Sequence, residues 1–294
     1  MSYQEYRPSS FQLIPPVIKN ILIINVLLYV ASIIVKRKYD VDLADYLGLH
    51  YFFAEKFSPY QLITYMFMHS YMNAAGGIVF DHIFFNMFAL WMFGAVLENY
   101  WGAKRFLTFY LICGIGAALT HYIIFYFQIH PTMALINEYI AAPSNTAFEA
   151  FFHSQHFAKL APGEETQQLN DILNQYNQYR SDGNVSAALA SSVEFMKNYK
   201  VEVLNAPVVI GASGSIFGVL LAFGMLFPNT VLYLMFIPIP IKAKYAVIGY
   251  GLLELGLGVV NMESDNVAHF AHLGGMLFGF IMIKLWGSNR NQFY

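Results

Sequence analysis

The chain has 294 residues, of which 57% are hydrophobic and 12% are charged, and its mean hydropathy is +0.47. Because ordinary soluble domains carry roughly 25% charged residues, this composition excludes a water-soluble globule and indicates an integral, multi-pass membrane protein in a lipid bilayer. The formal net charge of −2, with scattered basic residues, excludes a nucleic-acid partner, and the single cysteine excludes an intramolecular disulfide framework.

An apolar helix needs about 20 residues to cross the hydrocarbon core of a bilayer, and six stretches reach or approach this length. In chain order they lie at about 17–35, 82–98, 106–128, 210–227, 245–260 and 269–286. We predict a short interfacial turn at 98–105 and, where two prolines are followed by two lysines, a loop at 238–244.

Hydrophobicity falls between the third and fourth stretches. Residues 129–206 are rich in Gln, Asn, Pro and acidic side chains and predict a polar insertion, with amphipathic helices at 169–179 and 186–199 and a turn at 181–184. The predicted fold class is therefore all-α, a bundle of six transmembrane helices with an insertion between helices 3 and 4. Its parts are an N-terminal segment at 1–16, helices 1–3 at 17–128, the insertion at 129–206, helices 4–6 at 207–288 and a tail at 289–294.

The basic residues predict the orientation, because cytoplasmic loops are enriched in Lys and Arg. With the N-terminus in the cytoplasm, eight basic residues outside the insertion lie inside, namely Arg7, Lys19, Lys104, Arg105, Lys242, Lys244, Lys284 and Arg290. Four lie on the other side, Lys36, Arg37, Lys38 and Lys56. We therefore expect both termini to be cytoplasmic and the insertion to be extracytoplasmic, although the cluster 36–38 argues against this orientation.

The second, fourth and sixth stretches run in one direction, so their N-terminal ends meet at one face of the membrane. Each of these ends carries polar residues: His82 and Asn86, then Ser213, then His272. A serine hydroxyl becomes a strong nucleophile when an imidazole takes its proton, which makes His272 the candidate base for Ser213. His82, Asn86 and the amides that begin the fourth helix are candidate oxyanion donors. No acidic residue lies near His272 on its own stretch, so we predict a dyad.

Glycines predict close contact between the fourth and sixth helices. Gly214 and Gly218 follow the serine, and Gly275 and Gly279 follow the histidine, each pair in the small-xxx-small spacing that lets two backbones approach. Phe217 lies one turn beyond Ser213, where we expect its ring to pack flat on the imidazole of His272.

Taken together, these motifs resemble the rhomboid family of intramembrane serine proteases, over roughly residues 57–128 and 207–287. The motifs are His82-x-x-x-Asn86, Gly94-x-x-x-Glu98 with Gly102, Gly211-Ala212-Ser213-Gly214-Ser215-Ile216-Phe217-Gly218, Phe227-Pro228, Ile237-Pro238-Ile239-Pro240-Ile241-Lys242-Ala243-Lys244, and Ala271-His272-Leu273-Gly274-Gly275-Met276-Leu277-Phe278-Gly279.

The resemblance implies a rhomboid-like bundle that cleaves the transmembrane segments of single-span or other membrane proteins. It implies Ser213 as nucleophile, His272 as base, and His82 and Asn86 as oxyanion donors. The residues implied to support them are Gly211, Gly214, Phe217, Gly275 and His69. No cofactor and no metal are expected. The six-span form favours a bacterial inner membrane, and the sequence predicts no oligomeric state.

Other interpretations remain open. A non-catalytic relative that binds transmembrane helices keeps the same bundle and glycines. His69, Asp81 and His82 near His269 and His272 also suggest a metal site, and hence a metal-dependent hydrolase. Without a metal, we expect His269 to be structural or solvent-facing, and we expect Glu98 and Glu254 to be structural.

Overall fold

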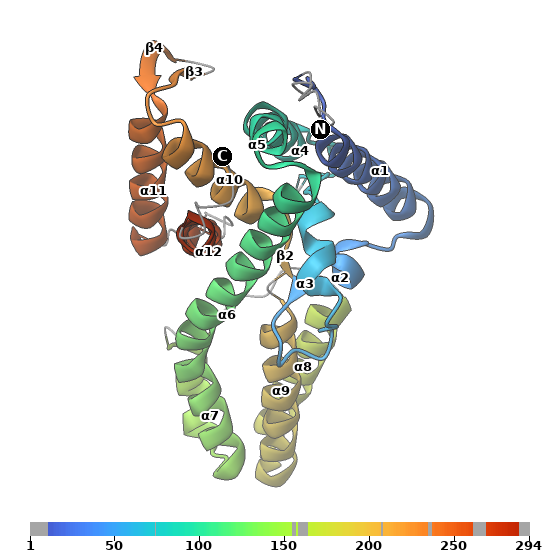
Figure 1. The fold of residues 1–294 in the computed structure, drawn as a ribbon. Helices are drawn as coiled ribbons and strands as arrows, with labels where there is room; N and C mark the ends of the chain where they lie inside the picture. Colours follow the sequence, from blue (N-terminus) through green and yellow to red (C-terminus); the bar gives the residue numbers. More distant parts are fainter. Residues whose placement is uncertain are drawn as a thin grey trace, which may run out of the picture. The chain divides into compact units, whose positions relative to one another are not determined.

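The computed structural model describes residues 11–73, 75–154, 157, 164–206, 208–234, 237–260 and 269–287, which are mostly helical (Figure 1). The helices are α1 (Pro16–Tyr39), α2 (Ala44–Leu47), α3 (Gln61–Thr64), η1 (Tyr65–Phe67), α4 (Asp81–Ala89), the π-helical turn η2 (Leu90–Gly94), α5 (Ala95–Trp101), α6 (Ala103–Ala141), α7 (Asn145–Phe152), α8 (Glu164–Ser181), α9 (Val185–Asn205), α10 (Ser213–Leu226), α11 (Ala243–Val260) and α12 (His269–Gly287). The strands are β1 (Leu49–His50), β2 (Val208–Val209), β3 (Val231–Leu234) and β4 (Ile237–Lys242). The predicted tail at 289–294 and most of the predicted segment 1–16 lie outside the described residues.

The chain divides into two compact units. The first, the bundle unit, comprises Met1–Leu47, Leu62–His121 and Ile210–Tyr294. The second, the insertion unit, comprises Gly48–Gln61 and Tyr122–Val209.

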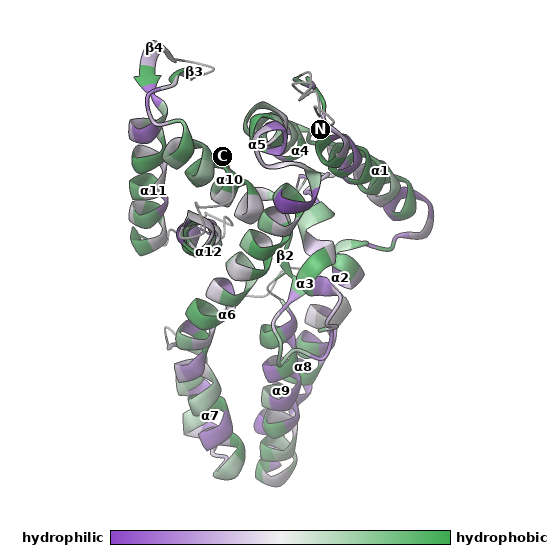
Figure 2. Cartoon of the chain, in the orientation of Figure 1, coloured by the Kyte–Doolittle hydropathy of each residue, from purple (hydrophilic) through white to green (hydrophobic). Residues whose placement is uncertain are grey.

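Among the described residues, five helices are long and apolar enough to cross a membrane: α1, the run Asp81–Trp101, α6, α11 and α12. All six predicted apolar stretches are helical, but the fourth gives the shorter helix α10, of 14 residues. Gly211, at φ +126°, keeps the residues before Ser213 out of the helix, and Pro228 follows its C-cap. Figure 2 shows the apolar colouring of α1, α10 and α11. The protein is an integral, multi-pass membrane protein.

Two predicted boundaries in this part of the chain are wrong. The interfacial turn at 98–105 is confined to Gly102, at φ +81°, because the chain is helical up to Trp101 and again from Ala103. The third helix does not end at 128 but continues to Ala141, through Pro131. Hydropathy marked the end of the apolar stretch, whereas Ile136 and Tyr139 extend the helix because they are buried in the core of the insertion unit.

The predicted loop at 238–244 is also wrong, because β3 and β4 pair there as an antiparallel hairpin. Tyr233 lies opposite Pro240 in the register. A proline donates no backbone hydrogen bond but is tolerated in a strand with an open edge, and both strands of a two-stranded sheet have one. Local proline signals alone therefore failed to distinguish this hairpin from a loop.

Glu98 is structural, as predicted, and it caps the start of α1. Its carboxylate, with the residue only 3% exposed, accepts hydrogen bonds from the backbone N–H of Val17 at 2.9 Å and of Ile18 at 2.8 Å. The first amides of a helix have no acceptor within the helix, so this carboxylate satisfies two of them and fixes α1 against α5.

The helices α10 and α12 pack backbone against backbone. A Cβ added at Gly275 would collide with the carbonyl oxygen of Gly214, and one added at Gly279 would lie 3.2 Å from the Cα of Gly218. The close approach predicted from the two glycine pairs is therefore present, and it brings the N-terminal turns of the two helices together.

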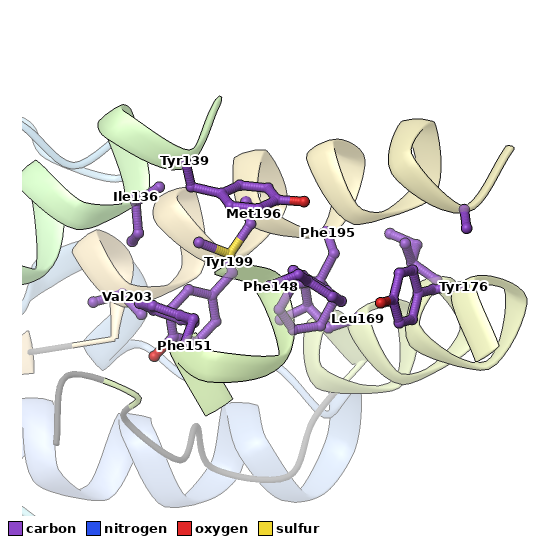
Figure 3. Close-up of a cluster of buried hydrophobic side chains, with 12 residues drawn as sticks. Ile136, Tyr139, Phe148, Phe151, Leu169, Tyr176, Phe195, Met196, Tyr199 and Val203 are labelled. Carbon is purple, nitrogen blue, oxygen red and sulfur yellow. The ribbon is translucent and has the colours of Figure 1, made fainter. Parts of the chain in front are cut away.

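The insertion unit has an apolar core of its own. The predicted amphipathic helices are present as the longer helices α8 and α9, and Asn184 ends the predicted turn by accepting a hydrogen bond from Ala187 N–H as the N-cap of α9. Figure 3 shows this core, in which Phe148 of α7 lies against the rings of Tyr176 and Phe195 at centroid distances of 4.6 and 5.5 Å.

Candidate active site

Ser213 and His272 are in hydrogen-bond contact. Ser213 is the first residue of α10 and His272 lies in the first turn of α12, and Ser213 Oγ is 2.8 Å from His272 Nε2. Ser213 is partly exposed, whereas His272 is 8% exposed. The hydroxyl is thus accessible while the imidazole behind it is held inside the protein.

A carboxylate from a third helix completes this array. Glu254 of α11 places Oε2 2.9 Å from His272 Nδ1. An ionised carboxylate only accepts hydrogen bonds, so Nδ1 carries the proton and Nε2 of the neutral ring presents its lone pair to Ser213. The predicted dyad is therefore backed by an acidic group, which α11 contributes rather than the helix that carries His272.

The same oxygen of Glu254 also contacts His269 Nδ1, at 2.7 Å. His269 is 7% exposed and therefore does not face solvent, so only the structural half of its predicted role agrees with this position. Both histidines lie in the first turn of α12, and their three-residue spacing presents both rings to α11.

Phe217 packs on the outer face of the imidazole. Its ring lies 4.3 Å from the ring of His272, with an angle of 8° between the two planes. The predicted flat packing is therefore present, and together with the bond to Glu254 it fixes both the position and the plane of the base.

His82 lies near the serine, and Gly211 is next to both side chains. Its Nδ1 accepts a hydrogen bond from Ser70 N–H at 3.3 Å, so the neutral ring carries its proton on Nε2 and donates from there. A Cβ built on Gly211 would lie 3.1 Å from His82 Nε2 and 3.5 Å from Ser213 Oγ. The absence of a side chain at Gly211 therefore leaves a space that borders both a ring donor and the hydroxyl.

Asn86 lies one turn beyond His82 on the same face of α4 and is 8% exposed. Its Nδ2 donates to the main-chain carbonyl of His82 at 2.7 Å, a bond within its own helix. The structure therefore places Asn86 next to His82 but directs this amide proton along α4.

His69 is buried behind His82. It is 1% exposed, and its ring meets the ring of His82 edge-on at a centroid distance of 5.1 Å. Burial, with a smaller contribution from the neighbouring His82, lowers the pKa of His69 to about 3. His69 is therefore neutral at physiological pH and supports the ring of His82 by packing.

The start of α10 adds backbone donors to the same place. The carbonyl of Ala212 accepts the first bond of the helix, from Ile216 N–H at 3.0 Å. The amides of Ser213, Gly214 and Ser215 precede this first donor and are therefore the orphan N–H groups of the helix start. Such amides, with the positive end of the helix dipole, stabilise negative charge.

Glu254, His269 and His272 are also the kinds of residue that bind metals, and one ligand atom from each lies within 4.8 Å of the others. Ligands at about 2.0–2.2 Å from a tetrahedral zinc ion would stand more than 3 Å from one another. The bonds of 2.7 and 2.9 Å from Glu254 are hydrogen bonds instead. Of the residues that suggest a metal site in the sequence, His269 and His272 belong to this cluster, whereas His69, Asp81 and His82 do not.

The sequence predicts no acidic partner for His272, because no acidic residue lies near it on its own helix, and Glu254 was therefore not predicted as part of the site. One signal was available: an acidic residue is costly inside an apolar helix and usually has a buried partner. Glu254 lies in the middle of the apolar run of α11, and two buried histidines on α12 were the partners to consider.

Fold and site define a polytopic helical membrane protein that carries a Ser–His pair where two tightly packed helices begin. The Rhomboid domain profile matches the chain at residues 56–129 and 183–289, and the chain belongs to the rhomboid family. Members of this family are generally intramembrane serine proteases that act on membrane-protein substrates, and some members are inactive. No curated protein and no solved structure matches the chain.

Proposed function

We propose that this protein is an intramembrane serine endopeptidase that cleaves transmembrane segments of other membrane proteins. The observation that carries the proposal is the distance of 2.8 Å between Ser213 Oγ and His272 Nε2. This is the contact that a nucleophile and its general base require.

In the proposed reaction, Ser213 Oγ attacks the scissile carbonyl carbon while His272 Nε2 takes the hydroxyl proton. The carbonyl oxygen becomes an oxyanion in the space beside Gly211, where His82 Nε2–H, Asn86 and the first amides of α10 act as donors. When the carbon–nitrogen bond breaks, His272 returns the proton to the leaving amine. A water molecule, deprotonated by His272, then attacks the acyl-enzyme. When the ester bond breaks, His272 returns this proton to Ser213 Oγ and the acyl group leaves with a new carboxyl terminus.

The length of α10 supports a reaction below the membrane surface. Its 14 residues span about 21 Å at 1.5 Å per residue, less than the roughly 30 Å of bilayer hydrocarbon. If all six apolar helices cross and the C-terminal end of α10 lies at one surface, Ser213 lies beneath the other. A substrate helix must unwind there to expose its carbonyl, so we expect small residues at the cut and helix-weakening Gly, Pro or polar residues nearby.

The proposed setting follows the distribution of basic residues. Both termini lie in the cytoplasm, the N-terminal ends of α4, α10 and α12 face the extracytoplasmic side, and residues 129–206 lie on that side as well. Water reaches Ser213 from that side, while the substrate enters laterally from the bilayer. A bacterial inner membrane is the proposed location.

The decisive experiment compares two serines on one helix. A fluorophosphonate probe should label the wild-type protein in detergent and should not label Ser213→Ala, which should also fail to cleave a single-span model substrate. Ser215→Ala is the matched control, because Ser215 is two residues away and its hydroxyl instead contacts Met66 Sδ at 3.3 Å. It should remain labelled.

Retained cleavage by Ser213→Ala would contradict the proposal. If the wild type binds the model substrate but neither cleaves it nor reacts with the probe, the chain is a non-catalytic binder of transmembrane helices. If a chelator abolishes cleavage by the wild type, a metal-dependent hydrolase replaces the serine mechanism.

A further inference from the structure

Glu254 stands out because one of its oxygens contacts two histidines. It is 8% exposed, and its Oε2 lies 2.7 Å from His269 Nδ1 and 2.9 Å from His272 Nδ1. A buried carboxylate is costly unless hydrogen bonds compensate for the lost water, and here two ring N–H groups supply them. A role that only linked α11 to α12 would need one histidine, and the second contact reaches the imidazole that touches Ser213.

The bond to Glu254 selects the tautomer of His272. With the proton held on Nδ1, the lone pair of Nε2 points to Ser213 Oγ; with the opposite tautomer, Nε2–H would face the hydroxyl and the ring could not take its proton. A neutral imidazole rotates and tautomerises freely unless its second nitrogen is engaged. When His272 accepts the proton of Ser213, the adjacent carboxylate also neutralises the imidazolium.

The backbone of α11 is shaped to bring Glu254 within reach. Gly258 lies four residues after Glu254 and therefore on the same face of the helix. A Cβ on Gly258 would lie 3.1 Å from the ring of Phe270 and 3.3 Å from the Cβ of His269, tighter than ordinary van der Waals contact. The small residue thus lets the first turn of α12 approach the helix that carries the carboxylate.

We infer that Glu254 is a positioning residue that holds His272 in the Nδ1–H tautomer for proton transfer from Ser213. This inference rests on the proposed protease function. It makes the site a Ser–His–Glu array assembled from α10, α12 and α11, in which His269 is a bystander to the proton transfer.

The test is a comparison of Glu254→Gln with His269→Gln in the full-length protein. Loss of the acid in a serine hydrolase triad costs up to about 10⁴-fold in kcat, and we expect Glu254→Gln to lower kcat and the rate of fluorophosphonate labelling by about 10²-fold or more, with KM within twofold. His269→Gln keeps the contact between Glu254 and His272, so its kcat should stay within about threefold of wild type. A purely structural link between α11 and α12 predicts similar losses in the two variants, and that result would overturn the inference.

A readout that does not depend on activity separates this inference from the proposed function. In ¹⁵N-histidine-labelled protein, the ¹⁵N shifts should assign the Nδ1–H tautomer to His272 in the wild type and in Ser213→Ala. The alternative tautomer should appear in Glu254→Asn, whose shorter side chain no longer reaches the ring. The same variant replaces Glu254→Gln in the kinetic test if Glu254→Gln unfolds. If the wild type shows this tautomer but no labelling by the probe, the proposed function fails while the positioning by Glu254 stands. Normal labelling with unchanged rates in Glu254→Gln would overturn the inference and leave the protease intact.

Discussion

The contact between α10 and α12 in the bundle unit and the core of the insertion unit use opposite kinds of packing. In the bundle unit, α10 and α12 touch through glycines, and Gly275 faces the carbonyl of Gly214 with no room for a methyl group. In the insertion unit, large rings fill the centre, with Phe148 and Tyr199 at 0% and 1% exposure (Figure 3). The contact between α10 and α12 depends on the absence of side chains, whereas the core of the insertion unit depends on their volume.

The two kinds of packing differ because lipid and water provide different driving forces for contact between helices. Between helices in lipid there is no hydrophobic driving force, so contact depends on close backbone approach and on buried polar bonds. Burying aromatic surface away from water is worth roughly 25 cal/mol per Å², and this drives a core such as that of the insertion unit. Accordingly, the polar array of Ser213, His272 and Glu254 lies in the bundle unit.

Among the tests of this comparison, the largest effect is expected for Gly275→Ala. The new methyl would strike the carbonyl oxygen of Gly214 and push α12 away from α10, which lengthens the contact between Ser213 and His272. A displacement of about 1 Å at a reacting centre costs about 10²-fold, so we expect that loss in the rate of fluorophosphonate labelling.

The control for this substitution is Gly256→Ala, since a Cβ there meets nothing within 4 Å. The probe should label Gly256→Ala at the wild-type rate, because the added methyl group meets no neighbour and alanine favours a helix more than glycine does. Equal losses in the two variants would mean that glycine content, rather than the contact between α10 and α12, sets the activity.

Phe148→Ala tests the other kind of packing. Phe148 is fully buried, and truncation of such a ring costs about 3–5 kcal/mol. We expect hydrogen exchange in α7–α9 to increase strongly, while Ser213 in the bundle unit is still labelled. Val185→Ala, at a side chain that is 54% exposed, is the control and should leave exchange unchanged. Loss of labelling in Phe148→Ala would show that the two units unfold as one.

Sequence alone predicted the bundle unit better than the insertion unit. The apolar runs and the glycine spacing around Ser213 and His272 each express a strong physical constraint, so both could be read directly. The extension of α6 to Ala141 could not, because the burial of Ile136 in a distant core decides it. Glu254 was missed for the same reason: its partners are separated from it by 15 and 18 residues, and only the packing of α11 on α12 joins them.

The buried histidine His69 predicts how the free energy of unfolding depends on pH. Burial lowers the pKa of His69 to about 3 from an ordinary value of 6.5, so the unfolded chain binds its proton first as the pH falls. The stabilisation from neutral His69 is therefore complete above pH 6.5 and is lost as the pH falls from there toward 3. At pH 5 the loss is about 2 kcal/mol relative to pH 7.5.

Thermal unfolding in detergent at the two pH values measures this effect. His69→Gln should reduce the pH dependence by that amount. An unchanged slope in His69→Gln would assign the acid sensitivity to other groups.

The smallest effect is expected at the surface of the insertion unit. Arg180 Nη2 lies 3.1 Å from Glu149 Oε1, as close as many buried pairs, but the two side chains are 41% and 54% exposed. Water screens such pairs, whose measured worth is about 0–1 kcal/mol, so Arg180→Ala should change the free energy of unfolding by less than about 0.5 kcal/mol. Glu254, with bonds of similar length but at 8% exposure, should cost far more to remove because its partners have no water to replace it. Chemical denaturation of Arg180→Ala and Glu254→Gln tests whether burial, rather than bond length, sets the contribution of a polar contact in this protein. A large loss of stability in Arg180→Ala would contradict that view.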